Sequence, residues 1–139
     1  MSDLGLDAVA LEASGAFVRA AGLVLDEVTA TRITGHIDLT EEHHTPWGIV
    51  HGGVYATAIE SAASIGATTA VRDRGMVAVG LTNTTHFLRS VTSCRVRVEA
   101  DALNQGRTQQ LWRVDVRDEA DRLLAHGEVR LQNLDPTAG

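Results

Sequence analysis

The chain has 139 residues, enough for one domain and too few for two ordinary ones. Its formal charge of -6 at pH 7 disfavours a nucleic acid as partner, because neutralising phosphates requires a basic face. All 12 basic residues are arginine, so Schiff-base and general-base chemistry by lysine are excluded.

The N-terminus and the cysteine content indicate the compartment. The first residues include Asp3 and Asp7 and lack the basic region of a secretion signal. Glu60 interrupts the longest apolar stretch, so no membrane-spanning helix is expected. Cys94 is the single cysteine and is expected to be a buried structural thiol. We therefore predict a soluble, cytoplasmic protein with a single domain over residues 1–139.

The first third of the chain predicts a helix followed by a hairpin. Leu6–Ala21 has apolar side chains at helical spacing, and Gly22 marks its end. Leu23–Ala30 and Arg32–Leu39 alternate apolar and polar residues, which predicts two paired strands. Residues 40–50 fit neither period, and a polar loop with a proline and a tryptophan is a place to look for function.

A long helix is predicted over Gly52–Val71, apolar on nearly all sides and therefore buried, with Arg72 and Asp73 at its end. Strand-like runs separated by turn signals follow at Met76–Ser90, Cys94–Leu103, Thr108–Arg117 and Leu123–Leu134. An apolar helix must be enclosed, and an antiparallel sheet of five or six strands curled around it does so. The predicted class is α+β with one central helix.

Glu60 is the first candidate for chemistry. It lies in the middle of the predicted buried helix, with no lysine or arginine within ten residues on either side. Burying a lone carboxylate is costly unless the group is paired or protonated, and such groups are candidate general bases or nucleophiles. Alternatively, Glu60 faces a subunit surface or bonds a distant arginine. Ser64, one turn later, shares its helix face and either orients the carboxylate or a water, or simply packs.

The run His51-Gly52-Gly53 immediately precedes the same helix. Free N–H groups at a helix start stabilise negative charge, and glycine lets a carbonyl approach closely, so the run suits an oxyanion hole; a plain turn is the alternative. Gly52 and Glu60 are eight residues apart, about 12 Å along a helix. One small carbonyl can contact both only if they come from two subunits, which predicts at least a dimer.

The remaining candidates are histidines and aromatic residues. His43 and His44, with His51, raise the question of a metal, but no cysteine or carboxylate completes a ligand spacing, so no metal site is predicted. Trp47, Ile49, Tyr55 and Phe87 either line a pocket for an aryl or medium-chain acyl group or belong to the core. The core is favoured for Tyr55 and Phe87, because aromatic residues make up only 4% of the chain and cores need them.

Several runs resemble a known family. Gly48–Val54, followed by Glu60, resembles the signature of the hotdog-fold thioesterases. It is most similar to the branch with the Arthrobacter-type 4-hydroxybenzoyl-CoA thioesterase, the phenylacetate-pathway thioesterases and the enterobactin proofreading thioesterase. His86–Val91, Asn104–Arg107 and Ala125–Gly127 follow the order seen there, so the resemblance spans most of the chain.

This resemblance implies a hotdog fold and an acyl-CoA thioesterase that releases free acid and CoA from a small aryl- or medium-chain acyl-CoA, without a cofactor. Glu60 would be nucleophile or general base, and the Gly52 N–H would polarise the thioester carbonyl. His51 would help position that carbonyl, and Ser64 would hold the carboxylate or the hydrolytic water. The resemblance also implies a homotetramer made of two dimers.

The resemblance further implies a substrate surface. The residues assigned to substrate or CoA binding are Gly53, Thr45, Trp47, His86, Arg89, Gly106 and Arg107. Arg89 and Gly106-Arg107 resemble the surface that meets the nucleotide end of CoA, whereas His86 is otherwise an ordinary strand residue. Thr45 stands where relatives have Gln or Asn, so an amide that orients the carbonyl or water is missing. Ser90 stands where proline is common.

Two other functions compete with hydrolysis. A hotdog dehydratase or hydratase also pairs an acid with a histidine around an acyl thioester, although His44-Thr45-Pro46 matches its loop poorly. A non-catalytic acyl-CoA-binding protein would keep the fold without the reaction, and Thr45 is the residue that hints at it.

Overall fold

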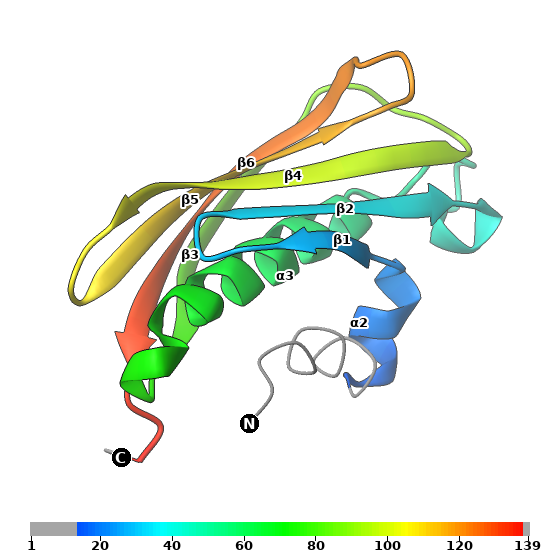
Figure 1. The fold of residues 1–139 in the computed structure, drawn as a ribbon. Helices are drawn as coiled ribbons and strands as arrows, with labels where there is room; N and C mark the ends of the chain where they lie inside the picture. Colours follow the sequence, from blue (N-terminus) through cyan, green and yellow to red (C-terminus); the bar gives the residue numbers. More distant parts are fainter. Residues whose placement is uncertain (1–13, 138–139) are drawn as a thin grey trace.

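The structure is a computed structural model that describes residues 14–137. It contains a six-stranded antiparallel sheet in the order β1-β2-β4-β5-β6-β3, with one long helix against it (Figure 1). The strands are β1 (Val24–Val28), β2 (Arg32–Leu39), β3 (Val77–Phe87), β4 (Cys94–Gln105), β5 (Gln109–Arg117) and β6 (Leu123–Leu134). The helices are α2 (Ala16–Ala21) and α3 (Gly52–Val71), with short 3-10 turns η1 (Glu41–His43) and η2 (Arg72–Arg74). The predicted α+β hotdog architecture is confirmed.

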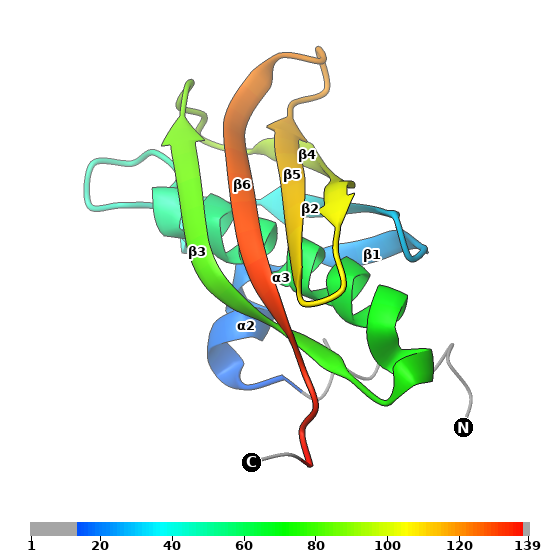
Figure 2. The same cartoon turned by 90° about the vertical axis from the view of Figure 1, so that its left-hand side faces the viewer.

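The sheet curves across α3 and forms the core with it (Figure 2). On β4, Val96, Val98 and Ala100 are fully buried, whereas Arg95 and Arg97, which alternate with them, are exposed. Burial of one face of each strand against one helix is the main stabilising contribution to such a fold.

The N-terminal helix α2 begins later than predicted. Its N-cap is Gly15, so the predicted helix Leu6–Ala21 is wrong for residues 14–15, and its part over residues 6–13 lies outside the described residues. Its predicted end is confirmed, because Gly22 adopts a left-handed conformation with φ of 83° and its N–H bonds the Arg19 carbonyl.

Helix α3 has the predicted bounds, but the prediction that it is buried on nearly all sides is wrong for the single chain. The sheet covers Ala58, Ile59 and Ala62, whereas Glu60 and Ser64 on another face are only half-buried. Small and polar side chains there leave a face that the chain itself does not cover. Within the described residues, no helix has both the length and the apolar character that crossing a membrane requires.

Cys94 is half-buried rather than fully buried as predicted. It packs against the edge of the core, and burial raises the pKa of its thiol, with nearby Asp118 adding to the effect. A thiol of this kind is less reactive than an exposed one.

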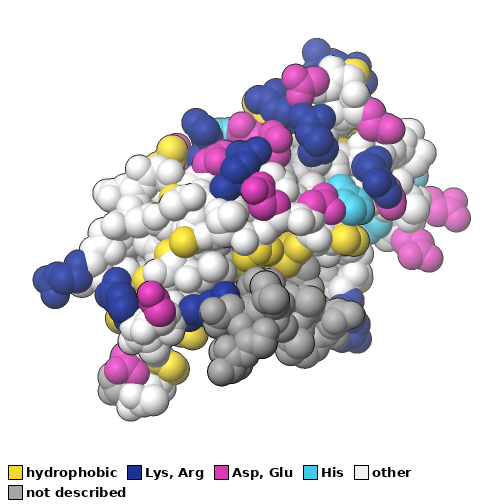
Figure 3. Space-filling model, in the orientation of Figure 1, with side chains coloured by type: hydrophobic (Ala, Val, Ile, Leu, Met, Phe, Trp, Pro, Cys, Tyr) yellow, Lys and Arg dark blue, Asp and Glu magenta, His cyan; other side chains and the backbone are white. Residues whose placement is uncertain are grey.

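The outer face of the sheet carries interspersed charges of both signs (Figure 3). Arg32 pairs with Asp101 at 2.7 Å, and Asp115 lies between His126 at 2.7 Å and Arg117 at 3.7 Å. These side chains are half-buried at the surface, where solvent still screens their charges, so each pair contributes little stability. The outer face is therefore polar, whereas the edge strand β3 carries no Asp, Glu, Lys or Arg.

Candidate active site

The start of α3 presents a free hydrogen-bond donor. His51 is the N-cap, and its Nδ1 accepts the Gly53 N–H at 2.8 Å. An accepting Nδ1 places the proton of the neutral ring on Nε2, which can donate to a ligand. Within residues 14–137 the Gly52 N–H has no hydrogen-bond partner. Gly52 and His51 thus offer two donors at the positive end of a 20-residue helix.

One cavity, of about 590 Å³, lies on the β3 side of this helix start. Phe87 at the end of β3 covers Gly52, since a Cβ there would lie 2.8 Å from its Cζ. Phe87 is 57% exposed, so its assignment to the core is wrong; it borders the cavity instead. A side chain at Gly52 would therefore displace the Phe87 ring, which is a reason for glycine here besides any approach of a ligand.

Tyr55 forms part of the wall of the same cavity. It is 2% exposed, so its predicted place in the core is confirmed. Its hydroxyl is buried and has no hydrogen-bond partner among the described residues. Burial, with a smaller contribution from Cys94, raises the pKa of Tyr55 to about 12. The hydroxyl is therefore neutral at any physiological pH.

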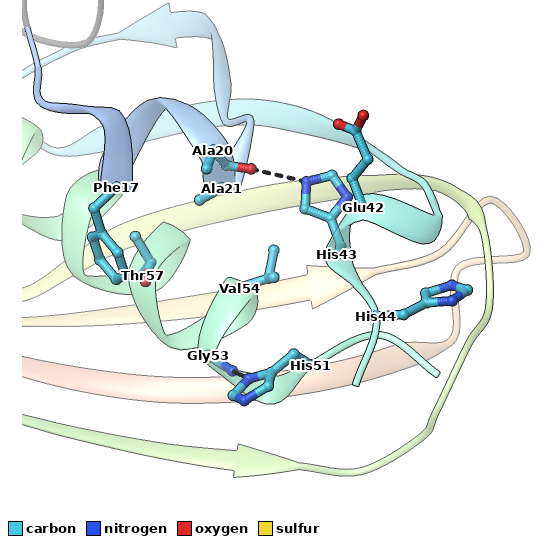
Figure 4. A pocket seen from close by; sticks show the side chains of 10 residues that line it. All are labelled: Phe17, Ala20, Ala21, Glu42, His43, His44, His51, Gly53, Val54 and Thr57. Carbon is cyan, nitrogen blue, oxygen red and sulfur yellow. Dashed lines mark hydrogen bonds between the residues drawn. The ribbon is translucent and has the colours of Figure 1, made fainter. Parts of the chain in front are cut away.

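A second cavity, of about 310 Å³, lies between α2 and the start of α3 (Figure 4). Phe17 of α2 points toward Thr57 of α3 at one end of it, and Val54 lines it closer to His43 and His51. Glu42 lies at this cavity and is exposed. His51 borders both cavities, so the two flank one helix start.

The neighbouring histidines hold the backbone. His43 accepts the Thr40 N–H at Nδ1, at 3.1 Å, and donates from Nε2 to the Ala20 carbonyl at 3.0 Å, which joins η1 to α2 (Figure 4). His44 bonds the Thr92 carbonyl through Nε2. Across the part of the chain that is described, no three potential metal ligands are gathered.

Glu60 lies apart from both cavities in the single chain, because it lines neither. Its Oε1 accepts a hydrogen bond from the Asn83 amide of β3 at 3.1 Å. Its partner is thus an amide and not the distant arginine considered from the sequence, and Asn83 was not among the site residues predicted from the sequence. Among the described residues, Ser64 makes no hydrogen bond to Glu60, although the two share a helix face.

Of the other residues predicted to contact the substrate, some lie at a cavity and some do not. Thr45 and Arg89 line the larger cavity, and the Thr45 hydroxyl accepts the N–H of Trp47 at 3.2 Å in a turn. Trp47 is 83% exposed at the tip of that turn. His86 pairs in register with His126, whose side chain is on the outer face of the sheet, so His86 points away from both cavities.

Gly106 and Arg107 lie far from Arg89. They form the β4–β5 turn, where the Arg107 carbonyl accepts a hydrogen bond from Arg74 at 3.2 Å, beyond the C-terminal end of α3. Arg89 lies at the other end of this helix, which is about 30 Å long. Arg89 and Arg107 of one chain therefore do not form one surface.

Known proteins resemble this chain in sequence and fold. Residues 48–125 match the family model described as Thioesterase superfamily. A Mycobacterium tuberculosis protein that bears only a provisional esterase name is 40% identical over 116 residues, or 82% of this chain and 83% of that protein. Its solved structure matches with a TM-score of 0.82 and 41% identity, covering 85% of this chain and 95% of the other.

Two further relatives have names that state an activity. A 1,4-dihydroxy-2-naphthoyl-CoA hydrolase of Listeria monocytogenes is 32% identical over 103 residues, or 74% of this chain and 83% of that protein. A proofreading thioesterase of Klebsiella pneumoniae is 31% identical over 121 residues, or 86% of this chain and 87% of that protein.

Proposed function

Because the chain belongs to the thioesterase superfamily, we propose that it hydrolyses an acyl-CoA thioester to a free acid and CoA. The predicted family and the predicted class of enzyme, a thioester hydrolase, are confirmed by the relatives. The observation that carries the proposal is the pair of free donors at the start of α3, flanked by two cavities. A thioester bridging them would place its carbonyl at Gly52.

The proposed chemistry uses three groups. The Gly52 N–H and the His51 Nε2–H donate to the carbonyl oxygen and stabilise the charge that develops on it during attack. Glu60 either takes a proton from the attacking water or attacks the carbonyl itself and forms an anhydride that water then cleaves. In both routes the tetrahedral intermediate collapses by expelling the CoA thiolate, which then takes up a proton.

The proposed site is completed by a second subunit through strand β3. Gly52 and Glu60 are about 12 Å apart along one helix, too far to act on one carbonyl. Strand β3 is an edge strand, has no charged residue along Val77–Phe87, and exposes Val79 (41%) and Leu81 (49%). Uncharged apolar edges favour pairing with another strand. We infer that two copies pair along β3 and that Glu60 of one faces Gly52 of the other; a tetramer would join two such dimers.

Charge favours one orientation of the substrate. Arg89 lies at the larger cavity and suits the phosphates of CoA, whereas Glu42 at the smaller cavity repels them. Phe17 and Val54 in the smaller cavity suit an apolar group. We infer that a small aryl or medium-chain acyl group enters the cavity beside α2, and the aryl-CoA relative supports this class.

Thiol release from a panel of aryl- and acyl-CoAs, followed with a thiol-reactive dye, tests this function. Glu60→Ala is expected to lower kcat by about 10²- to 10⁴-fold, while CoA still binds as a competitive ligand. Hydrolysis that survives Glu60→Ala would remove Glu60 from the reaction. CoA binding without hydrolysis of any thioester by the wild type would favour a dehydratase or a binding protein.

Mixing two inactive variants tests the shared site. His51→Ala and Glu60→Ala remove groups that we assign to opposite subunits of each site. After unfolding and refolding together, half of the dimers are mixed and each has one intact site, so about a quarter of the wild-type activity returns. If both groups acted from one chain, no activity would return. Each variant refolded alone is the control.

A further inference from the structure

We propose that Gly80 and Asn83 of β3 are positioning residues that form a cradle for the Glu60 carboxylate and fix its direction. The inference rests on the proposed catalytic role of Glu60 and adds the groups that orient it. Both residues lie on the strand opposite the middle of α3, and neither is expected to contact the substrate.

The Asn83 amide is itself held in one orientation. Its Nδ2 lies 3.1 Å from Glu60 Oε1 and 3.2 Å from the Ala56 carbonyl oxygen. Both oxygens only accept hydrogen bonds when Glu60 is ionised, so the NH₂ group and not the carbonyl of Asn83 must face them. The Thr85 hydroxyl donates to Asn83 Oδ1 at 2.7 Å on the other side. The Asn83 side-chain amide is therefore held at its nitrogen and at its oxygen, which fixes the direction of the N–H that it donates to Glu60.

Gly80 provides the space for the second carboxylate oxygen. A Cβ at Gly80 would lie 2.2 Å from Glu60 Oε2 and 3.2 Å from its Cδ. No side chain other than hydrogen fits while Glu60 keeps this position. Because the obstructing atom is the end of a flexible side chain, an alanine would move the carboxylate and not the backbone.

A bulge in β3 brings the two residues to one face. Gly80 and Asn83 are three positions apart, and in a regular strand side chains at odd separations point to opposite faces. The register of β3 with β6 shifts between Gly80 and Thr82, which leaves Leu81 as the extra residue. Gly80 then pairs with Leu131 and Asn83 with Val129, both buried residues on the inner face.

The cradle orients Glu60 without neutralising it. A neutral amide holds one carboxylate oxygen, and no arginine of the described chain pairs with this group. An arginine in that place would tie up the charge that a base or nucleophile needs. The arrangement therefore combines a fixed direction with an available lone pair, as preorganised catalysis requires.

Gly80→Ala and Asn83→Ala test the cradle, with Thr84→Ala as matched control because Thr84 lies on the same strand and points to the outer face. Gly80→Ala is expected to lower kcat by about a hundredfold and Asn83→Ala by about tenfold, each with KM and Tm near wild type. Asn83→Asp places a second carboxylate beside the first, so the acidic limb of the kcat/KM profile moves to higher pH. Thr84→Ala should match the wild type in all of these.

The outcomes separate the two proposals. If Glu60→Ala is inactive while Gly80→Ala and Asn83→Ala keep the wild-type kcat, the cradle is overturned and the proposed function stands. If Glu60→Ala is active, the proposed function is overturned. In the Glu60→Ala background, Gly80→Ala should cause no further loss. A measurement without substrate is also available: the side-chain amide NMR signal of Asn83 should shift with pH in the wild type and not in Glu60→Gln. An unchanged signal in the wild type overturns the contact.

Discussion

Replacing Gly66 by alanine tests how closely α3 packs on the sheet. A Cβ at Gly66 would lie 2.3 Å from Cη2 and 2.7 Å from Cζ3 of Trp112 on β5. Trp112 is fully buried, and its Nε1 donates to Gln110 Oε1 at 2.9 Å, so the ring cannot turn away without losing a buried hydrogen bond. Overpacking of this kind costs about 1–3 kcal/mol, offset by a gain of about 1 kcal/mol in helix propensity.

The expected net effect of Gly66→Ala is a destabilisation of up to about 2 kcal/mol, or a fall in Tm of up to about 6 °C. Thermal and urea unfolding at one fixed protein concentration measure it, because association changes the apparent stability. In a Trp112→Phe background the space opens, and the same change should be neutral or stabilising. A higher Tm for Gly66→Ala in the wild-type background would refute the close packing of α3 on β5.

Three further predictions concern Asp118 in the turn after β5, Tyr55 in the wall of the larger cavity and Val79 on the β3 edge. Asp118 accepts the Arg122 N–H at 2.9 Å, and this bond, the nearby guanidinium and the Ala120 N–H lower the pKa of Asp118. Asp118→Asn should therefore lower Tm at pH 7, and the difference should vanish as the pH falls below the lowered pKa; a gap that persists in acid contradicts this. Tyr55→Phe removes a buried hydroxyl without a described partner and should stabilise the fold by about 1 kcal/mol in urea unfolding, whereas a loss would reveal a partner. Val79→Arg should yield monomers in sedimentation experiments, and the comparably exposed Leu103→Arg should not.

The sequence predicted the fold well because its periods are clear. Gly52–Val71 has too many small apolar residues in a row for a strand, and the helix has those bounds. Strands β4 and β5 alternate over most of their length, as Val96 and Val98 show, and a turn with Gly106 and a charged turn after β5 separate the last three strands. Local pattern alone was sufficient for these elements.

The candidate site was predictable only in part, because contacts across the fold do not follow from spacing. The His51-Gly52 donors are local to a helix start and were found. The partner of Glu60 was missed because Asn83 lies 23 positions away and reaches the inner face only through a bulge. A glycine within a strand, such as Gly80, is a sequence signal for a bulge or a close approach and could have pointed there.

Strand β3 connects assembly with chemistry. Its outer edge lacks the charges that keep edge strands apart, its inner face holds Glu60 through Asn83, and its end places Phe87 over Gly52. Pairing along β3 would therefore rigidify the residues that orient the carboxylate while bringing it to the other subunit's helix start. A separated chain would lose the opposite half of the site, although its own Asn83 would still bind its Glu60. Catalysis and dimerisation are then expected to fail together when the β3 edge is disrupted, as in Val79→Arg, whereas changes at Glu60, His51, Gly80 or Asn83 should lower activity without separating the subunits.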